Sequence, residues 1–293
     1  MIGFGIKPWL KKLQSYGITG DLLHWLDDYV SDKKQEVVVN NECSNPNTVK
    51  AGVPQGSVLG PLIFLLYIND ITDNLGNLAR LFADDTSLSY FGRNYDIMKS
   101  DINNDLSKLN EWAKLWLVDF NPKKTKALVI STSAVPHLDL RFNGEPVEIV
   151  KTHKHLGLTF ASDGNWTNHI DNIVNAAFKQ VNVLRKLKFT LSKQTLSNIY
   201  LTFIRPTLEY ACEVWDGCFE REVAKLEKVQ LESARIVTGL TQFASRDSLY
   251  YETGWEPLSC RRKSRKLTTF YKMHNKVCPQ YLCNYLPPTV SSI

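Results

Sequence analysis

The chain has 293 residues, of which 43% are hydrophobic and 22% charged, and this composition excludes intrinsically disordered and fibrous proteins. Six cysteines are too few for a disulfide scaffold, and the longest apolar run, about eleven residues over 58–68, is too short to span a bilayer. The net charge of +5 is uneven, because residues 1–150 carry 15 Lys and Arg against 18 Asp and Glu, whereas residues 151–293 carry 20 against 12.

The first half of the chain mixes helical and strand patterns. Two short apolar runs over 78–90 predict a hairpin with Asp84 and Asp85 at its tip. A loop dense in turn residues is expected over 51–57. Apolar residues at helical spacing predict helices, and short β-branched or apolar runs predict strands. The expected helices are 19–31, 59–71 and 95–117, and the expected strands are 34–40, 126–131, 138–142 and 156–160.

The pattern changes near residue 165, because helical spacing then dominates to the end of the chain. The sequence therefore predicts an α+β fold with a mixed first domain, residues 1–164, and an all-helical second domain, residues 165–293. The helices expected in the second domain cover 170–187, 192–205, 207–215, 220–238 and 258–275.

The Asp84–Asp85 pair is the first candidate for chemistry. Two neighbouring acids between Phe82 and Leu88 repel each other and lose hydration unless a cation neutralises them. Carboxylate oxygens suit Mg²⁺, so the pair can form half of a two-metal site for phosphoryl or nucleotidyl transfer. By itself, however, Asp-Asp is also an ordinary turn signal.

The loop that precedes the second predicted helix is the second candidate. Gly56 and Ser57 open this helix and place free backbone N–H groups where a phosphate or a base can dock. Gln55 can donate and accept a hydrogen bond at a base edge or a sugar. An ordinary helix-capping loop explains the same residues equally well.

Together, the two candidates carry a resemblance to a known family. Gly52-Val-Pro-Gln-Gly-Ser57 and the apolar run up to Ile71 are followed closely by Leu81-Phe-Ala-Asp-Asp-Thr86. This combination closely resembles the reverse transcriptases of non-LTR (LINE-type, jockey-like) retrotransposons. The resemblance covers nearly the whole chain, because further segments are similar to later motifs of that family, namely 112–125, 155–159, 204–216, 226–230 and 238–240.

The resemblance implies a polymerase palm, an antiparallel sheet with packed helices, followed by a helical thumb and C-terminal region. It implies RNA-directed DNA polymerase activity on an RNA template, a DNA primer and dNTPs. Asp84 and Asp85 match the metal-binding acids, with two Mg²⁺ or Mn²⁺ ions in the complete enzyme. The resemblance implies that Asp84 contacts both ions and that Asp85 supports from the side. Lys124, with Lys123 as a close rival, matches a lysine near the leaving pyrophosphate. The residues that match the template and nucleotide site and the primer-supporting turn are Pro54, Gln55, Gly56, Ser57, Phe82, Leu156 and Gly157.

One metal ligand of that family has no counterpart in this sequence. The family carries a further Asp shortly before a segment that resembles Trp9-Leu-Lys-Lys-Leu-Gln-Ser-Tyr-Gly-Ile18, yet no Asp precedes Asp21 here. With Asp84 and Asp85 alone, two cations have few protein ligands. We therefore expect a truncated or late-starting polypeptide that does not polymerise DNA by itself. The alternatives are a non-catalytic nucleic-acid-binding remnant and an unrelated Mg²⁺-dependent phosphotransferase.

Basic residues of the second half are candidates for phosphate contacts, although a solvated helical face explains them equally well. No charged segment followed by a cleavage site comes after Met1, so we expect an intracellular protein, in the cytoplasm, the nucleus or both, that is neither secreted nor membrane-bound. The oligomeric state is not readable from the sequence. The candidate nucleic-acid contacts are Lys179, Arg185, Lys186, Arg261, Arg262 and Lys263.

Overall fold

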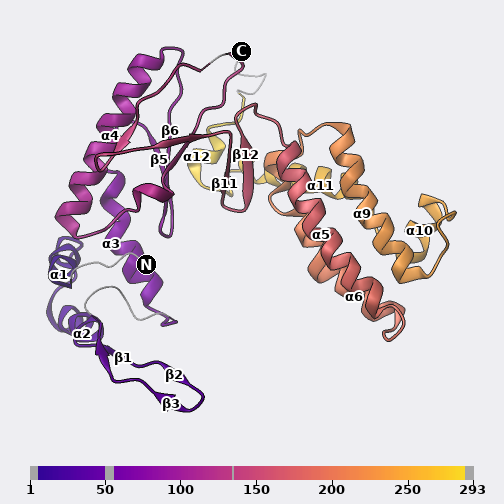
Figure 1. Cartoon of the computed structure of the whole chain (residues 1–293), viewed down its shortest axis with the longest axis horizontal. Helices are drawn as coiled ribbons and strands as arrows, with labels where there is room; N and C mark the ends of the chain where they lie inside the picture. Colours follow the sequence, from indigo (N-terminus) through magenta and orange to yellow (C-terminus); the bar gives the residue numbers. More distant parts are fainter. Residues whose placement is uncertain (1–5, 50–55, 134, 288–293) are drawn as a thin grey trace. The chain divides into compact units, whose positions relative to one another are not determined.

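The computed structural model describes residues 6–49, 56–133 and 135–287 (Figure 1). Contacts divide the chain into two compact units, which we call unit 1, residues 1–127 with 134–149, and unit 2, residues 128–133 with 150–293. Helices and short strand pairs alternate in the first part, and the second part is mainly helical, so the expected α+β class is confirmed. No helix in the described ranges has both the length and the apolar character to cross a bilayer.

The described residues of unit 1 form four α-helices and a set of short strands. The side chain of Asn94 starts α4 by accepting hydrogen bonds from the backbone N–H groups of Asp96 and Ile97. The helices are α1 (Ile6–Ser15), α2 (Gly20–Val30), α3 (Gly60–Ile68) and α4 (Tyr95–Trp116), with 3₁₀ turns at Asn69–Thr72 and Pro122–Lys124. The strands are β1 (Lys34–Gln35), β2 (Val38–Val39), β3 (Glu42–Cys43), β4 (Asn47–Thr48), β5 (Leu78–Phe82), β6 (Asp85–Ser89), β8 (Arg141–Phe142) and β9 (Glu145–Pro146).

The strands form pairs and not one continuous sheet. In the described residues each sheet has two strands, in the pairs β1–β4, β2–β3, β5–β6, β8–β9, β11–β12 and β7–β10. The last pair, β7 (Lys126–Leu128) and β10 (Glu148–Val150), lies at the boundary between the units. The structure therefore differs from the expected palm sheet. Strands of two to five residues form few ladder bonds, and an isolated pair of this kind is only marginally stable in water.

A buried lysine joins three helical segments in the core of unit 1. The ammonium of Lys12 lies 4.2 Å from the ring centre of Trp116 and about 5 Å from those of Tyr67 and Trp112. It forms an ion pair of 2.5 Å with Asp70, which also accepts a hydrogen bond of 2.8 Å from the Trp112 indole. Burial lowers the pKa of Lys12, and Asp70 opposes this effect. This cluster attaches α1 to α4 and to the end of α3.

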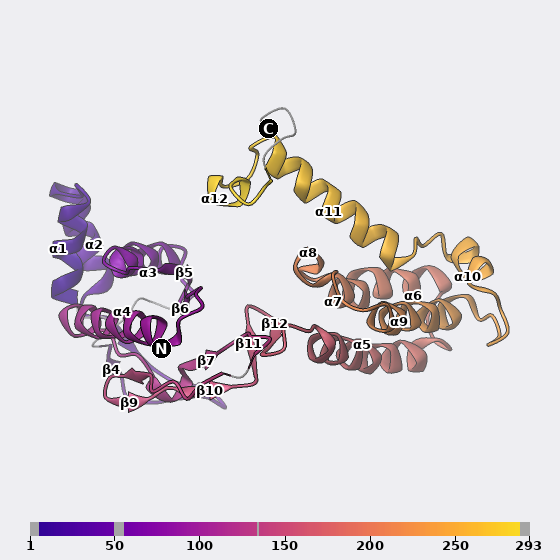
Figure 2. The ribbon, with the colours of Figure 1, turned by 90° about the horizontal axis from the view of Figure 1, so that it is seen from above.

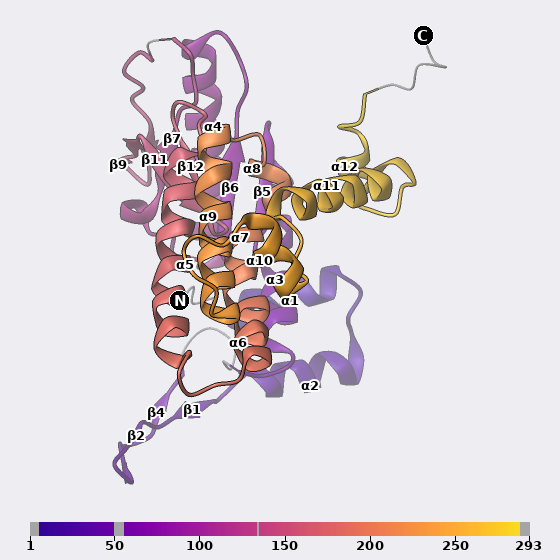
Figure 3. The same cartoon turned by 90° about the vertical axis from the view of Figure 1, so that its right-hand side faces the viewer.

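Unit 2 is a helical bundle that follows one hairpin, β11 (Thr152–His155) and β12 (Leu158–Ala161). Its two longest helices, α5 and α9, lie side by side (Figure 3). Their facing residues, among them Ile170, Ala177, Val181, Leu226 and Val229, are fully buried. The helices are α5 (Thr167–Leu187), α6 (Lys193–Ile199), α7 (Arg205–Glu209), α8 (Cys212–Trp215), α9 (Glu220–Thr238), α10 (Arg246–Thr253), α11 (Leu258–His274) and α12 (Gln280–Cys283).

Two of the expected helices are interrupted. The segment expected as a helix over 192–205 ends in a π-helical turn, Tyr200–Ile204. The segment expected over 207–215 breaks at Tyr210 and Ala211, because Ala211 takes a left-handed conformation with φ of 49°. The indole of Trp215 donates a hydrogen bond of 2.8 Å to the Tyr210 carbonyl that the break exposes.

His169 gives unit 2 a pH-dependent stability. The residue is 1% exposed, Nδ1 accepts a hydrogen bond from the Thr159 backbone N–H at 3.3 Å, and Nε2 has no hydrogen-bond partner among the described residues. Burial, assisted by Lys154, lowers the pKa of His169 below its usual 6.5. The unfolded chain therefore binds more protons than the folded one below pH 6.5, and the free energy of unfolding falls as the pH drops from 6.5 through the folded pKa.

We expect His169→Asn to remove this part of the pH dependence, because the Asn side chain keeps an acceptor near Thr159 but does not titrate. The lost slope corresponds to at most one bound proton, which is about 1.4 kcal/mol of unfolding free energy per pH unit. Urea unfolding between pH 7 and pH 5 measures it. The exposed His274→Asn is the control, and it should keep the wild-type slope. An unchanged slope in His169→Asn would contradict the assignment.

Candidate functional site

The Asp84–Asp85 pair lies at the tip of the β5–β6 hairpin, as the sequence predicts. Phe82 pairs with Asp85 in the antiparallel ladder, so Ala83 and Asp84 form a two-residue turn. Ala83 has φ of 51°, the sign that the first turn residue takes in a type II′ turn. Both carboxylates and the Phe82 ring, 64% exposed, face solvent within the described part of the chain. The tip therefore presents two unshielded acids beside one aromatic ring.

The donor chemistry of this tip suits a hard divalent cation. Neither Asp84 nor Asp85 has an ion pair with a described Lys or Arg, so their oxygens are open to a ligand. Among residues 6–49, 56–133 and 135–287, however, no three His, Cys, Asp or Glu side chains gather into a metal site. Mg²⁺ takes one or two carboxylates together with substrate phosphates. The chemistry of the two carboxylates therefore fits Mg²⁺.

The predicted nucleotide loop is described only in part. Pro54 and Gln55 lie outside the described residues. Gly56 has φ of 76°, which favours glycine, and the Ser57 hydroxyl accepts a hydrogen bond of 3.0 Å from the Gly60 backbone N–H. Ser57 thus satisfies one free N–H group at the start of α3, which begins at Gly60.

The two candidate lysines for the leaving group lie in the 3₁₀ turn after α4. Both Lys123 and Lys124 are exposed, and neither has an ion pair with a described acid. The neighbouring Lys126 differs, because it is paired with Glu148. Geometry does not separate Lys123 from Lys124, so the choice between them stays a prediction.

The predicted primer-supporting turn belongs to unit 2. His155 pairs with Leu158, so Leu156 and Gly157 are the two turn residues, and both have positive φ, 46° and 82°. Two positive φ angles define a type I′ turn, in which Leu is an unusual first residue. The hydroxyl of Tyr210 donates a hydrogen bond of 3.0 Å to the Leu156 carbonyl. Sequence reasoning missed Tyr210 as the residue that fixes this turn.

The Tyr210 ring also covers Gly157. A Cβ atom at Gly157 would lie 3.0 Å from Cε1 of the ring. We expect Gly157→Ala to destabilise unit 2 by about 1–3 kcal/mol, from the positive φ and the clash together. Chemical denaturation followed by tryptophan fluorescence measures this loss.

Gly164→Ala is the matched control for this effect. Gly164 has a similar φ of 72° but only an ordinary contact of 3.7 Å with Ile130. Gly164→Ala should lose less stability than Gly157→Ala. When Tyr210→Leu is added to both variants, the difference between their stability losses should become smaller. Equal losses in the two Ala variants would show that the Tyr210 contact does not matter.

The candidate nucleic-acid contacts fall into two groups. Lys179, Lys186 and Lys263 are exposed and have no ion pair with a described residue. Arg185 is paired with Glu232 at 2.6 Å. Arg261 and Arg262 are also paired, with Glu209 at 2.5 Å and Asp216 at 2.6 Å, and the side chain of Arg262 is 1% exposed.

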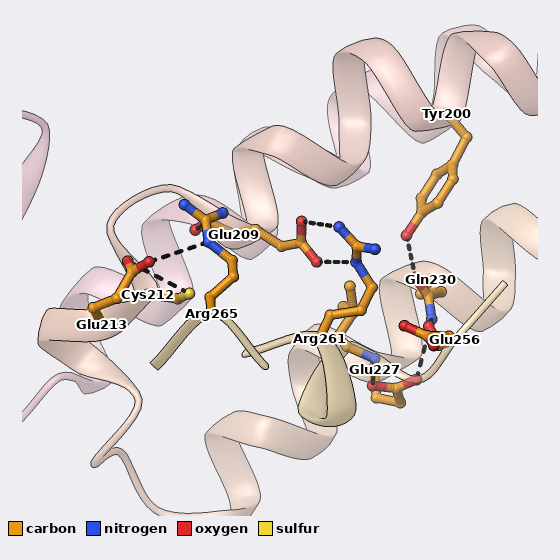
Figure 4. Close-up of polar contacts among 10 residues, drawn as sticks. Tyr200, Glu209, Cys212, Glu213, Glu227, Gln230, Glu256, Arg261 and Arg265 are labelled. Atoms are coloured by element: carbon orange, nitrogen blue, oxygen red, sulfur yellow. Dashed lines mark hydrogen bonds and ion pairs between the residues drawn. The ribbon is translucent and has the colours of Figure 1, made fainter. Parts of the chain in front are cut away.

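The acids that neutralise α11 are a feature that sequence reasoning did not identify. Figure 4 shows Glu209 in a two-bond contact with Arg261, while Glu213 accepts from Arg265 at 3.2 Å. Asp216 also accepts from Lys266 at 2.5 Å. Four cations of α11 are therefore paired within unit 2, namely Arg261, Arg262, Arg265 and Lys266. No signal for these pairs was present in the sequence, because the helix expected over 207–215 breaks between Glu209 and Glu213, and one sequence does not show which element the acids face.

Comparison with known proteins agrees with these features. The family model described as "Reverse transcriptase (RNA-dependent DNA polymerase)" matches residues 6–160. The chain is 26% identical over 264 residues to the probable RNA-directed DNA polymerase from transposon X-element of Drosophila melanogaster, covering 87% of this chain and 28% of that protein. It is 24% identical over 238 residues to the corresponding protein from transposon BS of the same fly, covering 77% of this chain and 26% of that protein.

The RNA-directed DNA polymerase from the mobile element jockey of Drosophila melanogaster is 26% identical over 224 residues, covering 72% of this chain and 24% of that protein. The chain thus spans about a quarter of the length of these relatives. The family match covers more than half of the chain and includes both the Asp84–Asp85 hairpin and the Leu156–Gly157 turn. The chain belongs to the reverse transcriptase (RNA-dependent DNA polymerase) family, and its relatives are those of non-LTR retrotransposons.

Proposed function

We propose that this chain carries palm and thumb parts of an RNA-directed DNA polymerase, which extends a DNA primer on an RNA template. The observation that carries the proposal is the pair of exposed carboxylates, Asp84 and Asp85, at a hairpin tip inside the segment that matches the family. Both carboxylates face solvent and have no ion pair with a described Lys or Arg, so they are accessible to a divalent ion together with the phosphates of a nucleotide.

Each predicted site residue has a role in this proposal. Asp84 and Asp85 would hold Mg²⁺ or Mn²⁺, which, when bound, supplies charge neutralisation at the reacting phosphate oxygens. Lys124, or Lys123, would place a positive charge at the leaving pyrophosphate. The exposed Phe82 and the loop that ends in Gly56 and Ser57 would contact the template and the incoming dNTP. Pro54 and Gln55 belong to the same loop and would contact the same ligands. Leu156 and Gly157 would form the turn that supports the end of the primer.

The proposal includes a limit on activity. Two ions need more protein ligands than the two acids of one hairpin, and no described third acid lies with them. We propose that the 293-residue polypeptide, produced alone, binds a primer–template but does not extend it. The upstream strand that bears the further Asp in the family would have to be supplied for turnover.

Primer extension tests both parts of the proposal. The chain is compared with the same chain fused to the upstream polymerase segment of the X-element protein, each with a labelled primer on an RNA template, dNTPs and Mg²⁺. We expect template-dependent extension by the fused protein only. Extension by the unfused chain that is lost in Asp84→Ala would overturn the limit, and no extension by either protein would count against the polymerase proposal.

A non-catalytic nucleic-acid-binding remnant is the second candidate function. The observation that favours it is the set of exposed, unpaired cations Lys179, Lys186 and Lys263 among the described residues of unit 2. Such cations support binding to a phosphate backbone without sequence preference. Primer–template binding by both proteins, with extension by neither, would support this candidate.

A further inference from the structure

Helix α11 has two faces of different chemistry. One face, with Leu258 and Arg262, packs against α8 and α9 in unit 2. The second half of α11 and the following α12 project from the bundle of α5, α6, α7 and α9 (Figures 2 and 3). The side chains on the opposite face of α11 are therefore left to solvent within this unit.

That opposite face carries a continuous row, which we call the outer stripe. At 100° per residue, five positions fall within one 100° arc of the helix. All five are exposed, with Leu267 59%, Phe270 52% and Tyr271 66% exposed, and the Phe270 ring stacks on His274 with ring centres 6.3 Å apart. The outer stripe consists of Lys263, Leu267, Phe270, Tyr271 and His274.

The segment that carries the outer stripe contributes only positive charges. Residues 257–287 contain no Asp or Glu. The cations on the packed face are neutralised by acids of the preceding helices, whereas Lys263, Lys272 and Lys276 are exposed and have no ion pair with a described residue. Two further exposed rings, Tyr281 and Tyr285, continue the aromatic character beyond the helix. A ligand for this surface must carry negative charge and flat apolar faces together.

We propose that the outer stripe binds single-stranded nucleic acid, with bases stacked on Phe270 and Tyr271 and phosphates near Lys263 and Lys272. Single strands offer free base faces, whereas a duplex hides them inside its stack, so the exposed rings favour the single strand. Lys263 and His274 are about 16 Å apart along the helix axis, the length of four to five stacked nucleotides. This inference rests on the proposed function only in taking nucleic acid as the substrate class, and it requires no catalysis.

Fluorescence anisotropy tests the proposal with three fluorescein-labelled probes, dT12, rU12 and a blunt 12-base-pair DNA duplex. The buffer contains EDTA and no dNTPs, so polymerase activity has no influence. We expect the double variant Phe270→Ala/Tyr271→Ala to weaken binding of both single strands at least about tenfold, because stacking on an aromatic ring contributes strongly per base. Binding of the duplex should change by less than twofold.

The double variant Phe243→Ala/Tyr251→Ala is the matched control, because these rings are 87% and 88% exposed in the same unit but belong to α10 and the segment before it, and not to α11. Circular dichroism and thermal unfolding should match the wild-type chain for both variants, since all four rings are exposed. Photo-crosslinking of a 5-iodouridine oligonucleotide, followed by mass spectrometry, should map to Phe270 or Tyr271.

Several outcomes would overturn the proposal. One is an unchanged dissociation constant of Phe270→Ala/Tyr271→Ala for the single strands. Another is an equal loss of affinity in the control variant, or an equal loss of affinity for the duplex. The last is binding of an acidic amphipathic peptide in place of the single strands. Failure of primer extension together with loss of single-strand binding in Phe270→Ala/Tyr271→Ala would remove the polymerase proposal and leave this inference in place.

Discussion

Asp84→Asn in the fused, primer-extending protein is expected to reduce template-dependent dNTP incorporation by about 10³-fold or more. Removing one charged metal ligand takes away several kcal/mol of charge stabilisation, and each 1.36 kcal/mol corresponds to a factor of ten in rate. Asp84 is a turn residue and faces solvent at the hairpin tip, so its replacement leaves the β5–β6 ladder intact. Incorporation of a labelled dNTP under single-turnover conditions measures the effect.

Asp85→Asn is the matched comparison for Asp84→Asn. Asp85 is adjacent and also exposed, but it is the first residue of β6 and pairs with Phe82. The family resemblance implies that Asp84 contacts both ions and that Asp85 supports from the side. We therefore expect Asp85→Asn to reduce dNTP incorporation less than Asp84→Asn does. A larger loss in Asp85→Asn than in Asp84→Asn would reverse these assignments.

Replacing Asp216 by Ala is expected to destabilise unit 2 by about 3–5 kcal/mol, the cost of leaving a buried charge without its partner. Arg262 is that charge: its side chain is 1% exposed, its guanidinium lies 5.8 Å from the ring centre of Trp215, and its Nε is 2.6 Å from Asp216. Burial alone would raise the pKa of Asp216, but Lys266 and Arg262 outweigh it and hold the pKa below 3.8. The stabilisation by Asp216 is therefore complete above the pKa that Asp216 has in the unfolded chain. It is lost as the pH falls through the pKa that Asp216 has in the folded chain.

Guanidinium chloride unfolding at pH 7, followed by tryptophan fluorescence, measures the loss. The double variant Asp216→Ala/Arg262→Met should lose less stability than Asp216→Ala, because it leaves no buried charge. Glu213→Ala is the surface control, since its partner Arg265 is 43% exposed, and it should cost about 1 kcal/mol or less. Equal losses in Asp216→Ala and Glu213→Ala would contradict the buried-pair interpretation.

Helices with strong apolar periodicity were predictable from the sequence. The expected helices over 95–117, 220–238 and 258–275 agree with α4, α9 and α11 to within one residue at either end. Helix α10 was not predicted, because it has one buried apolar residue, Leu249, although Ser245 caps its start and Gly254 follows its end. The hairpin β8–β9 was also missed, although its turn, Asn143-Gly144, is a strong hairpin signal.

The candidate site was predictable where it depends on neighbours in the chain. The acid pair at a hairpin tip follows from apolar runs on both sides of Asp84 and Asp85. The contact of Tyr210 with the Leu156 carbonyl, across 54 residues, was not predictable, because the helical pattern runs through Tyr210 and gives no sign of the break that presents its ring. Long-range pairing of this kind depends on tertiary packing, which periodicity in one sequence does not contain.

The ion pairs of α11 have a consequence for how salt affects binding. Each phosphate that a cation neutralises on a single strand releases counterions, and the logarithm of the association constant then falls by about 0.7 per contact for each tenfold rise in salt. If all seven cations of residues 258–276 made such contacts, the slope would be about −5. Among the described residues of this helix and the turn after it, Lys263, Lys272 and Lys276 have no ion pair, and three such contacts give a slope of about −2. Binding at this helix would then weaken less steeply with rising salt than binding through a surface on which all seven cations are free.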